Sequence, residues 1–160
     1  MTTNIKSFIS FEPKEGKFSA FLPMETAIER EGNLESELSK LTKIYEDSID
    51  EMRFILKKIQ EARINKKPVP AYLIWRLGNK IFLLTNKLES LSFQLDGLYN
   101  HLVRDLGVKR KWLEKVIIFR RYVPNENIIP RLINWGVFEK GTRRKAEQLI
   151  NDSTHVRNNG

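Results

Sequence analysis

Residues 98 to 122 read LYNHLVRDLGVKRKWLEKVIIFRRY, an apolar segment that passes through a Leu-Gly-Val corner into a segment that is both basic and apolar. Gly107 in the corner suits the turn between two helices, because glycine readily adopts a positive φ. Apolar residues on both sides recur at the spacing with which consecutive helices bury side chains. They are Leu102, Leu106, Val108, Leu113 and Val116. The stretch therefore predicts a short helix, a turn at Gly107 and a second, basic helix.

Basic side chains follow the corner closely. The predicted second helix carries Lys109, Arg110, Lys111, Lys115, Arg120 and Arg121, as a helix that enters a DNA groove would require. A second group, Arg143, Arg144 and Lys145, stands in the first turn of a predicted C-terminal helix. Cations there oppose the helix dipole, so an anion nearby would explain them. We therefore expect both groups to contact DNA, with RNA as an open alternative.

The net charge of +8 is unevenly distributed along the 160 residues. Residues 1 to 60 hold 9 Lys and Arg against 11 Asp and Glu, whereas residues 61 to 160 hold 19 against 9. A basic half of this kind is the usual electrostatic footprint of polyanion binding. The alternative is a surface rich in Lys and Arg that serves only solubility.

The segment Leu102-Val103-Arg104-Asp105-Leu106-Gly107-Val108, followed by Leu113 and Val116, resembles the helix-turn-helix of bacterial, archaeal and phage regulators. Val103 departs from that pattern, because those proteins prefer a small residue where the two helices cross. The resemblance implies that residues near the start of the second helix meet base edges, where Arg or Lys can bind guanine O6 and N7. Otherwise the segment is an ordinary corner with a solvated basic face.

A second resemblance covers residues 60 to 124. It rests on Ala62-Arg63, on Tyr72-Leu73-Ile74-Trp75-Arg76-Leu77-Gly78-Asn79-Lys80-Ile81, and on Leu102, Asp105-Leu106-Gly107, Leu113 and Phe119 to Pro124. These residues look like the helical N-terminal domain of a family of restriction-associated nucleases, in which a Trp-x-x-Gly helix precedes a leucine-rich corner that ends in an aromatic residue, Tyr and Pro. The likeness implies a DNA-associated module from a defence or mobile-element context and transfers no catalytic residue.

Before the corner, two heptad patterns predict a pair of long helices. The first helix begins after Asn33, a suitable N-cap, and is about 45 Å long. Its a and d positions are Leu34, Leu38, Leu41, Tyr45, Ser48, Met52, Ile55 and Ile59. The pattern resumes after residues 65–70, at Ile74, Leu77, Ile81, Leu84, Leu88, Leu91, Leu95, Leu98 and Leu102. A short loop favours an antiparallel hairpin within one chain, but the same stripes could instead pair two chains into a homodimer.

Asp96-Gly97 is the predicted break between the second long helix and the first helix of the corner, since glycine weakens a helix interior. Without a break, the corner would be only the end of the long arm. We therefore expect an all-α fold with four segments: an arm or β-hairpin at 1–32, a coiled-coil hairpin at 33–97, a basic helix-turn-helix-like domain at 98–152 and a disordered tail at 153–160. In the third segment, Arg131 to Phe138 and Arg143 to Ile150 are further predicted helices.

No pattern typical of an enzyme competes with the basic helix. The chain has no cysteine, and it shows no phosphate loop, nucleophile elbow or array of metal ligands. Trp75, Trp112 and Trp135 can stack on bases, although their apolar neighbours favour core positions for Trp75 and Trp112. The acidic cluster Glu46, Asp47, Asp50 and Glu51 is most simply a solvated face. We therefore expect neither a cofactor nor a metal.

These observations predict a cytoplasmic, non-catalytic DNA-binding protein, since neither a signal peptide nor a membrane-spanning run is found. The long helices would serve as an arm or a dimer interface. The alternative is a helical interaction or assembly subunit that docks onto a larger protein or ribonucleoprotein partner.

Overall fold

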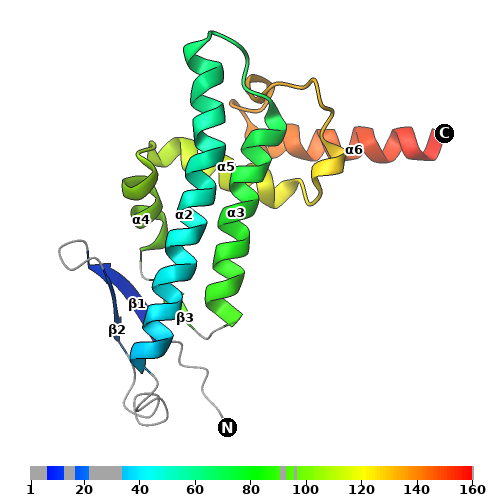
Figure 1. Ribbon diagram of the computed structural model, residues 1–160. Helices are drawn as coiled ribbons and strands as arrows, with labels where there is room; N and C mark the ends of the chain where they lie inside the picture. The colour runs from blue at the N-terminus through cyan, green and yellow to red at the C-terminus, as the bar shows by residue number, and fades with distance from the viewer. Residues whose placement is uncertain (1–6, 13–16, 22–33, 91–92, 96, 160) are drawn as a thin grey trace.

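The computed structural model describes residues 7–12, 17–21, 34–90, 93–95 and 97–159. Most of this part of the chain is helical, which confirms the predicted all-α class (Figure 1). The predicted N-cap at Asn33 lies outside the described residues.

The two long helices are α2 (Leu34–Ile64) and α3 (Ala71–Ser90), which run side by side in opposite directions (Figure 1). Their heptad residues are buried within the single chain. On α2 these are Leu41, Tyr45, Met52, Ile55 and Ile59, and on α3 they are Ile74, Leu77, Ile81, Leu84 and Leu88. The two stripes therefore bury each other without a second copy of the chain.

The end of α2 is closed by a residue in the left-handed conformation. Lys66 has a φ of 55°, the backbone N–H of Lys67 donates to the carbonyl of Ala62 at 2.8 Å, and that of Lys66 donates to the carbonyl of Arg63 at 3.1 Å. These two bonds form a Schellman motif, in which glycine usually takes the left-handed position. A lysine there carries the steric cost of its Cβ.

The second long helix ends earlier than predicted. It stops at Ser90, whereas the heptad pattern predicts continuation to Asp96. Phe93–Leu95 instead form strand β3, which pairs in parallel with β1 (Ser7–Glu12). This pairing satisfies backbone groups through a contact distant in sequence, which a local heptad pattern cannot encode.

β1 also pairs in antiparallel register with β2 (Lys17–Phe21), so the small sheet has the order β2-β1-β3. Phe8 stands opposite Phe21 and Phe11 opposite Phe18. Of the two predicted alternatives for this segment, the strands follow the β-hairpin rather than the extended arm.

Two glycines delimit the next helix, α4 (Leu98–Leu106). Gly97 precedes it with a φ of 64°, and Gly107 follows it, also with a φ of 64°. Three residues separate α4 from the basic helix α5 (Arg110–Tyr122). The predicted start of a separate helix at Gly97 and the predicted positive φ at Gly107 are both confirmed.

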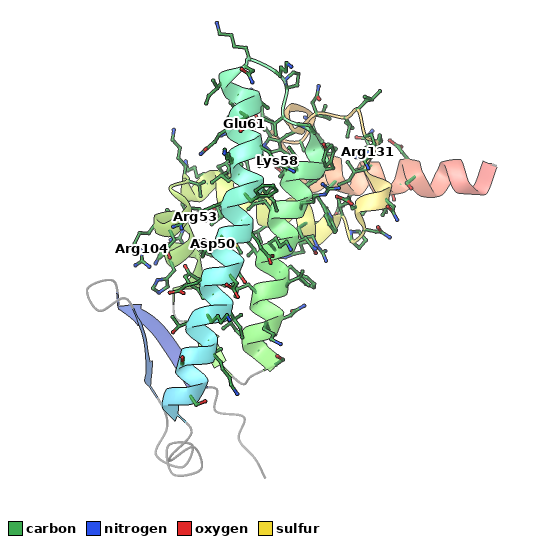
Figure 2. The ribbon with its side chains drawn as sticks, in the orientation of Figure 1. Asp50, Arg53, Lys58, Glu61, Arg104 and Arg131 are labelled. Carbon is green, nitrogen blue, oxygen red and sulfur yellow. The ribbon has the colours of Figure 1, made fainter. Side chains whose placement is uncertain are left out.

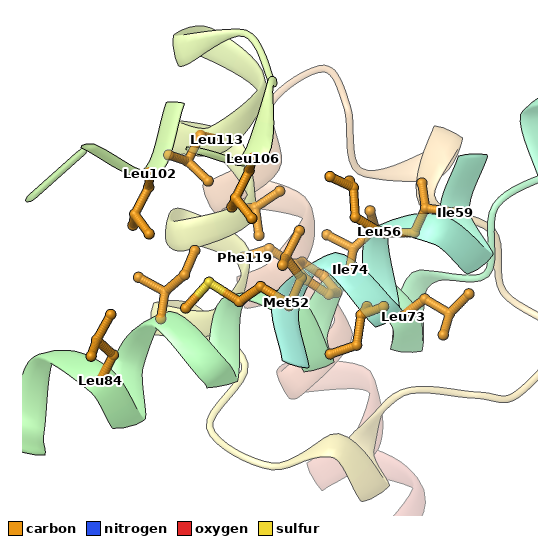
Figure 3. Packing of buried hydrophobic residues seen from close by; sticks show 14 of the residues in the cluster. Met52, Leu56, Ile59, Leu73, Ile74, Leu84, Leu102, Leu106, Leu113 and Phe119 are labelled. Carbon is orange, nitrogen blue, oxygen red and sulfur yellow. The ribbon is translucent and has the colours of Figure 1, made fainter. Parts of the chain in front are cut away.

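One apolar core joins the hairpin to the C-terminal half. Figure 3 shows Met52 of α2, Ile74 of α3 and Phe119 of α5 in this cluster, together with Leu102, Leu106 and Leu113. Val116 is also buried, while Val108 is partly buried against the same cluster. The residues that the sequence predicts as the inner side of the corner therefore form part of a common core with the long helices.

The segment after α5 is less helical than predicted. Arg131 to Phe138 contains only a 3₁₀ turn, η2 (Trp135–Val137), and a second 3₁₀ turn, η1 (Glu126–Ile128), precedes it. Its backbone bonds instead to the start of α3 and to the loop before it. Ala71 N–H donates to the Ile133 carbonyl at 3.1 Å, and Trp135 N–H donates to the Val69 carbonyl at 2.7 Å. These bonds prevent helical pairing, so the prediction of a helix here was wrong.

The last helix, α6 (Thr142–Asn159), is longer than predicted and extends away from the rest of the fold (Figure 1). It was expected to end at Ile150 and to be followed by a disordered tail. Residues 151–159 contain no Gly or Pro, so no residue there breaks the helix.

Candidate nucleic-acid interface

The basic helix α5 is held tightly against α3 at Gly78. A Cβ at this position would lie 2.7 Å from the Cβ of Arg120 and 3.0 Å from the carbonyl oxygen of Val116. The two helices can therefore approach this closely only because residue 78 has no side chain. One turn earlier on α3, the indole Nε1 of Trp75 donates to the carbonyl of Val123 at 2.7 Å. These contacts fix both the position and the end of α5.

The side of α5 opposite its buried residues is exposed at Arg110, Lys111, Glu114 and Arg121 and half-buried at Lys115, Ile117, Ile118 and Tyr122. Its helical period places Arg110, Glu114, Ile117 and Arg121 on one line and Lys111, Lys115, Ile118 and Tyr122 on the adjacent line. We call these eight residues the α5 outer face. Four of them are basic and one is acidic, so this face carries a net positive charge.

The first turn of α5 presents three of the predicted contact residues to solvent. Lys109 is the extended N-cap residue, while Arg110 and Lys111 are exposed in the helix. Arg110 donates to Asn100 Oδ1 of α4 at 2.6 Å and forms an ion pair with Glu114 at 3.3 Å. The guanidinium of Arg110 is therefore oriented by both helices of the corner.

The start of α6 adds further cations beside α5. Lys115, Arg143 and Arg144 line a shallow hollow of about 590 Å³ between the two helices. The guanidinium of Arg143 lies 4.8 Å from the ring centre of Tyr122 and forms an ion pair with Glu147 at 3.2 Å. Two residue groups that are about 30 positions apart in sequence thus share one surface.

Thr142 and Lys145 both belong to the first turn of α6. Lys145 is half-buried, and its backbone N–H donates to the Gly141 carbonyl in the first turn of α6. Thr142 is buried as the first helical residue, and its hydroxyl donates to the Phe138 carbonyl at 2.7 Å. It therefore stabilises the turn before α6.

Arg120 packs between α3 and α5. Its guanidinium lies 5.0 Å from the ring centre of Trp75 and 4.3 Å from that of Phe82, and its Nε donates to Asn79 Oδ1 at 3.0 Å. Burial lowers the pKa of Arg120 from its usual range. These contacts hold the Arg120 side chain between the two helices, a packing role that the sequence did not predict.

A second hollow lies on the other side of α5, where α3, α4 and α5 meet. It encloses about 290 Å³ and is lined by Gly78, Ile81, Phe82, Thr85, Asn86, Tyr99, Ile117, Arg120 and Arg121. We call it the aromatic groove. Two aromatic rings and two arginines line it, and no acidic residue is among its described lining. Phe82 and Tyr99 were not predicted as site residues, although each lies outside the heptad positions of its helix.

A polar cluster fixes α4 to α2. Tyr45 on α2 donates to Asp105 Oδ2 on α4, and Arg53 donates to the Asp105 carbonyl at 3.0 Å. Arg104 forms an ion pair with the same carboxylate at 3.0 Å, and Figure 2 shows Arg53 and Arg104 where α4 meets α2. Burial alone would raise the pKa of Asp105, but the hydrogen bonds from Arg104 and Tyr45 lower it overall. Burial and the bond to Asp105 raise the pKa of Tyr45.

The remaining residues singled out from the sequence lie away from the α5 outer face or within the core. Trp135 is fully buried against Phe119 and Phe138, and Trp75 and Trp112 are partly buried against the same core. In the acidic cluster, Glu51 pairs with Lys80 of α3 at 2.7 Å.

Among the described residues, no group of three or more potential ligands is placed to hold a metal ion. None of the described helices combines the length and the apolar character needed to cross a membrane.

Comparison with known protein families, curated proteins and solved structures finds no match to this chain.

Proposed function

We propose that the protein is a non-catalytic DNA-binding protein that contacts a duplex through the α5 outer face, Lys109 and the first turn of α6. The observation that carries this proposal is the shared surface of Lys115, Arg143 and Arg144. The cations of α5 and α6 face the same side although they belong to separate sequence segments. Such clustering of basic residues is what a phosphate backbone requires.

The charge on this surface is only partly neutralised by the protein itself. Arg110 and Arg143 pair with glutamates one helical turn away. Within the described part of the chain, Lys111, Arg121 and Arg144 make no ion pair, so their charges remain available to a ligand. Exposed ion pairs such as those of Arg110 and Arg143 contribute little to stability. Phosphate groups can therefore compete with the two glutamates for these arginines.

The corner formed by α4, Gly107 and α5 supports a helix-turn-helix-like mode of binding. In that mode the start of the second helix approaches base edges, which here places Lys109, Arg110 and Lys111 nearest the duplex. The hydrogen bond from Arg110 to Asn100 orients this turn before DNA arrives. The resemblance to restriction-associated nucleases adds a defence or mobile-element context to the same proposal.

A charge-reversal experiment tests the proposal. Arg110→Glu combined with Lys111→Glu should abolish binding to a mixed-sequence duplex in fluorescence anisotropy at low salt. Lys40→Glu combined with Lys43→Glu is the matched control, because both lysines are exposed on α2 and the change in charge is identical. The proposal fails if the two double variants bind equally well, or if the wild-type protein does not bind.

An assembly subunit is the second candidate, and exposed apolar residues favour it. Leu132 is 94% exposed and Ile64 is 78% exposed. If the protein docks onto a partner, Leu132→Ser should weaken capture of that partner while leaving the protein folded. Co-purification with a protein and without nucleic acid would favour this candidate over DNA binding.

The predicted homodimer through the heptad helices is a separate proposal. Because the two stripes bury each other within one chain, a dimer would have to use other surfaces of α2 and α3. The mass of the purified protein in solution tests this directly.

A further inference from the structure

The aromatic groove combines features that a helix surface rarely leaves open to solvent. Phe82 is 45% exposed and Tyr99 is 37% exposed, and both rings line the groove. Exposed aromatic rings grouped beside cations are typical of a binding surface. Phe82 and Tyr99 are too exposed to serve only as core residues.

The charge of the groove selects the kind of ligand. Arg120 and Arg121 line it, whereas its described lining contains no carboxylate. The hollow between α5 and α6 differs in this respect, because Glu139 and Glu147 line it along with the cations. The aromatic groove is therefore complementary to a ligand that has a flat apolar part and a negative charge.

The position of the groove connects it to the proposed DNA contacts. Ile117 and Arg121 belong both to the groove and to the α5 outer face. A strand that follows the α5 outer face can thus reach the groove without leaving the protein surface. The guanidinium of Arg120 packs 4.3 Å from the ring centre of Phe82. This contact holds the Phe82 ring in place before a ligand binds.

We propose that the aromatic groove binds an unpaired base of DNA, with Phe82 and Tyr99 as stacking surfaces and Arg121 as the contact to the adjacent phosphate. Stacking on aromatic side chains accepts any base and adds to the backbone charge contacts. This inference rests on the proposed function. It adds that the preferred ligand is a duplex with a single-stranded tail or junction rather than a blunt duplex.

The test compares a labelled blunt duplex with the same duplex extended by a short single-stranded tail. The wild-type protein should bind the tailed probe about fivefold to a hundredfold more tightly, as expected for the loss or gain of a base stack. Phe82→Ala and Tyr99→Ala should each reduce this advantage and leave binding to the blunt duplex within about twofold. Tyr99→Phe keeps the ring and should keep the advantage.

Phe54→Ala is the matched control. Phe54 is 63% exposed on α2. Lys58 Nζ lies 4.7 Å from its ring centre, a cation–π contact comparable to that between Arg120 and Phe82. This variant should behave as the wild-type protein with both probes. If Phe82→Ala does not fold, as judged by circular dichroism, Tyr99→Ala still decides the question.

Equal affinity of the wild-type protein for both probes would overturn the inference and leave the proposed function standing. An advantage for the tailed probe that survives in Tyr99→Ala would also overturn it. Failure of the wild-type protein to bind either probe would instead reject the proposed function itself.

Discussion

The indole Nε1 of Trp75 donates a 2.7 Å hydrogen bond to the carbonyl oxygen of Val123, and thereby ties the first half of α3 to the residue that ends α5. Val123 is fully buried, so its carbonyl has no access to bulk water. One turn further along α3, Gly78 admits the backbone of α5. The Trp-x-x-Gly spacing in the sequence therefore corresponds to two successive attachment points for the basic helix.

Replacing Trp75 by Phe should destabilise the protein by about 1 to 3 kcal/mol, because the buried carbonyl of Val123 loses its donor. Urea unfolding followed by circular dichroism measures this change. Trp112→Phe is the control, since Trp112 Nε1 has no hydrogen-bond partner within the described chain. A loss of stability that is equal in the two variants would show that ring volume, and not the hydrogen bond, is decisive.

Replacing Gly78 by Ala should destabilise the protein by about 1 to 3 kcal/mol through overpacking. The new methyl group would meet the Cβ of Arg120 at 2.7 Å, and neither that atom nor the α5 backbone can move freely. Gly136→Ala provides the comparison, because a Cβ there has nothing within 4 Å. Thermal unfolding of both variants tests the expectation, and a neutral Gly78→Ala would contradict the close crossing of α3 and α5.

Replacing Lys66 by Gly should stabilise the protein by about 0.5 to 1 kcal/mol. The left-handed conformation at Lys66 costs an L-residue about 1 to 2 kcal/mol, and glycine avoids this cost. Part of the stabilisation is offset because glycine loses more conformational entropy on folding. Lys67→Gly, at the neighbouring exposed lysine, should not stabilise. Denaturant midpoints measure the difference, and an unchanged or lower midpoint for Lys66→Gly would argue against the Schellman motif.

The cluster around Asp105 predicts an acid-dependent component of stability. Because the pKa of Asp105 is lowered in the folded protein, the stabilisation is present above the unfolded value of 3.8 and is lost as the pH falls through the lower folded value. Asp105→Asn should therefore be less stable near neutral pH and show a weaker acid dependence. Unfolding curves measured from neutral to acidic pH test this, and an unchanged acid dependence in Asp105→Asn would contradict it. Asp50→Asn, at an exposed carboxylate, should retain the wild-type dependence.

Tyr45 makes folding stability depend on pH in the alkaline range. Its folded pKa is raised, so the phenol ionises first in the unfolded chain and stability falls as the pH rises above 10.0. Tyr45→Phe should remove this alkaline component, since it has no proton to lose. An alkaline decline of the same size in Tyr45→Phe would exclude this residue as its source.

The sequence predicted best what depends on neighbouring residues. The turn at Gly107 and the burial of Leu102 and Leu113 follow from glycine conformation and helical spacing, and the structure confirms them. The end of α3 at Ser90 could not be predicted in this way, because it depends on pairing between β3 and β1. The irregular segment that ends at Phe138 likewise depends on backbone bonds to the distant loop before α3.

In the candidate interface, too, features set by neighbouring residues could be predicted, whereas features set by distant contacts could not. Exposed cations such as Lys111 and Arg144 could be predicted from composition and helix position. Arg120 could not be separated from them by sequence, since its contacts with Trp75 and Phe82 arise from the crossing of α3 and α5. The aromatic groove was missed for the same reason, because three helices contribute to it.

The salt dependence of DNA binding tests the central claim most directly. If the α5 outer face and the start of α6 together neutralise about five phosphates, log K should fall with log salt concentration at a slope of roughly −4 to −5. Reversing Arg110 and Lys111 should abolish binding, whereas Arg144→Ala should make the slope shallower by about one unit. A slope near zero for the wild-type protein, or no binding to a duplex at low salt, would contradict the claim that this surface binds DNA.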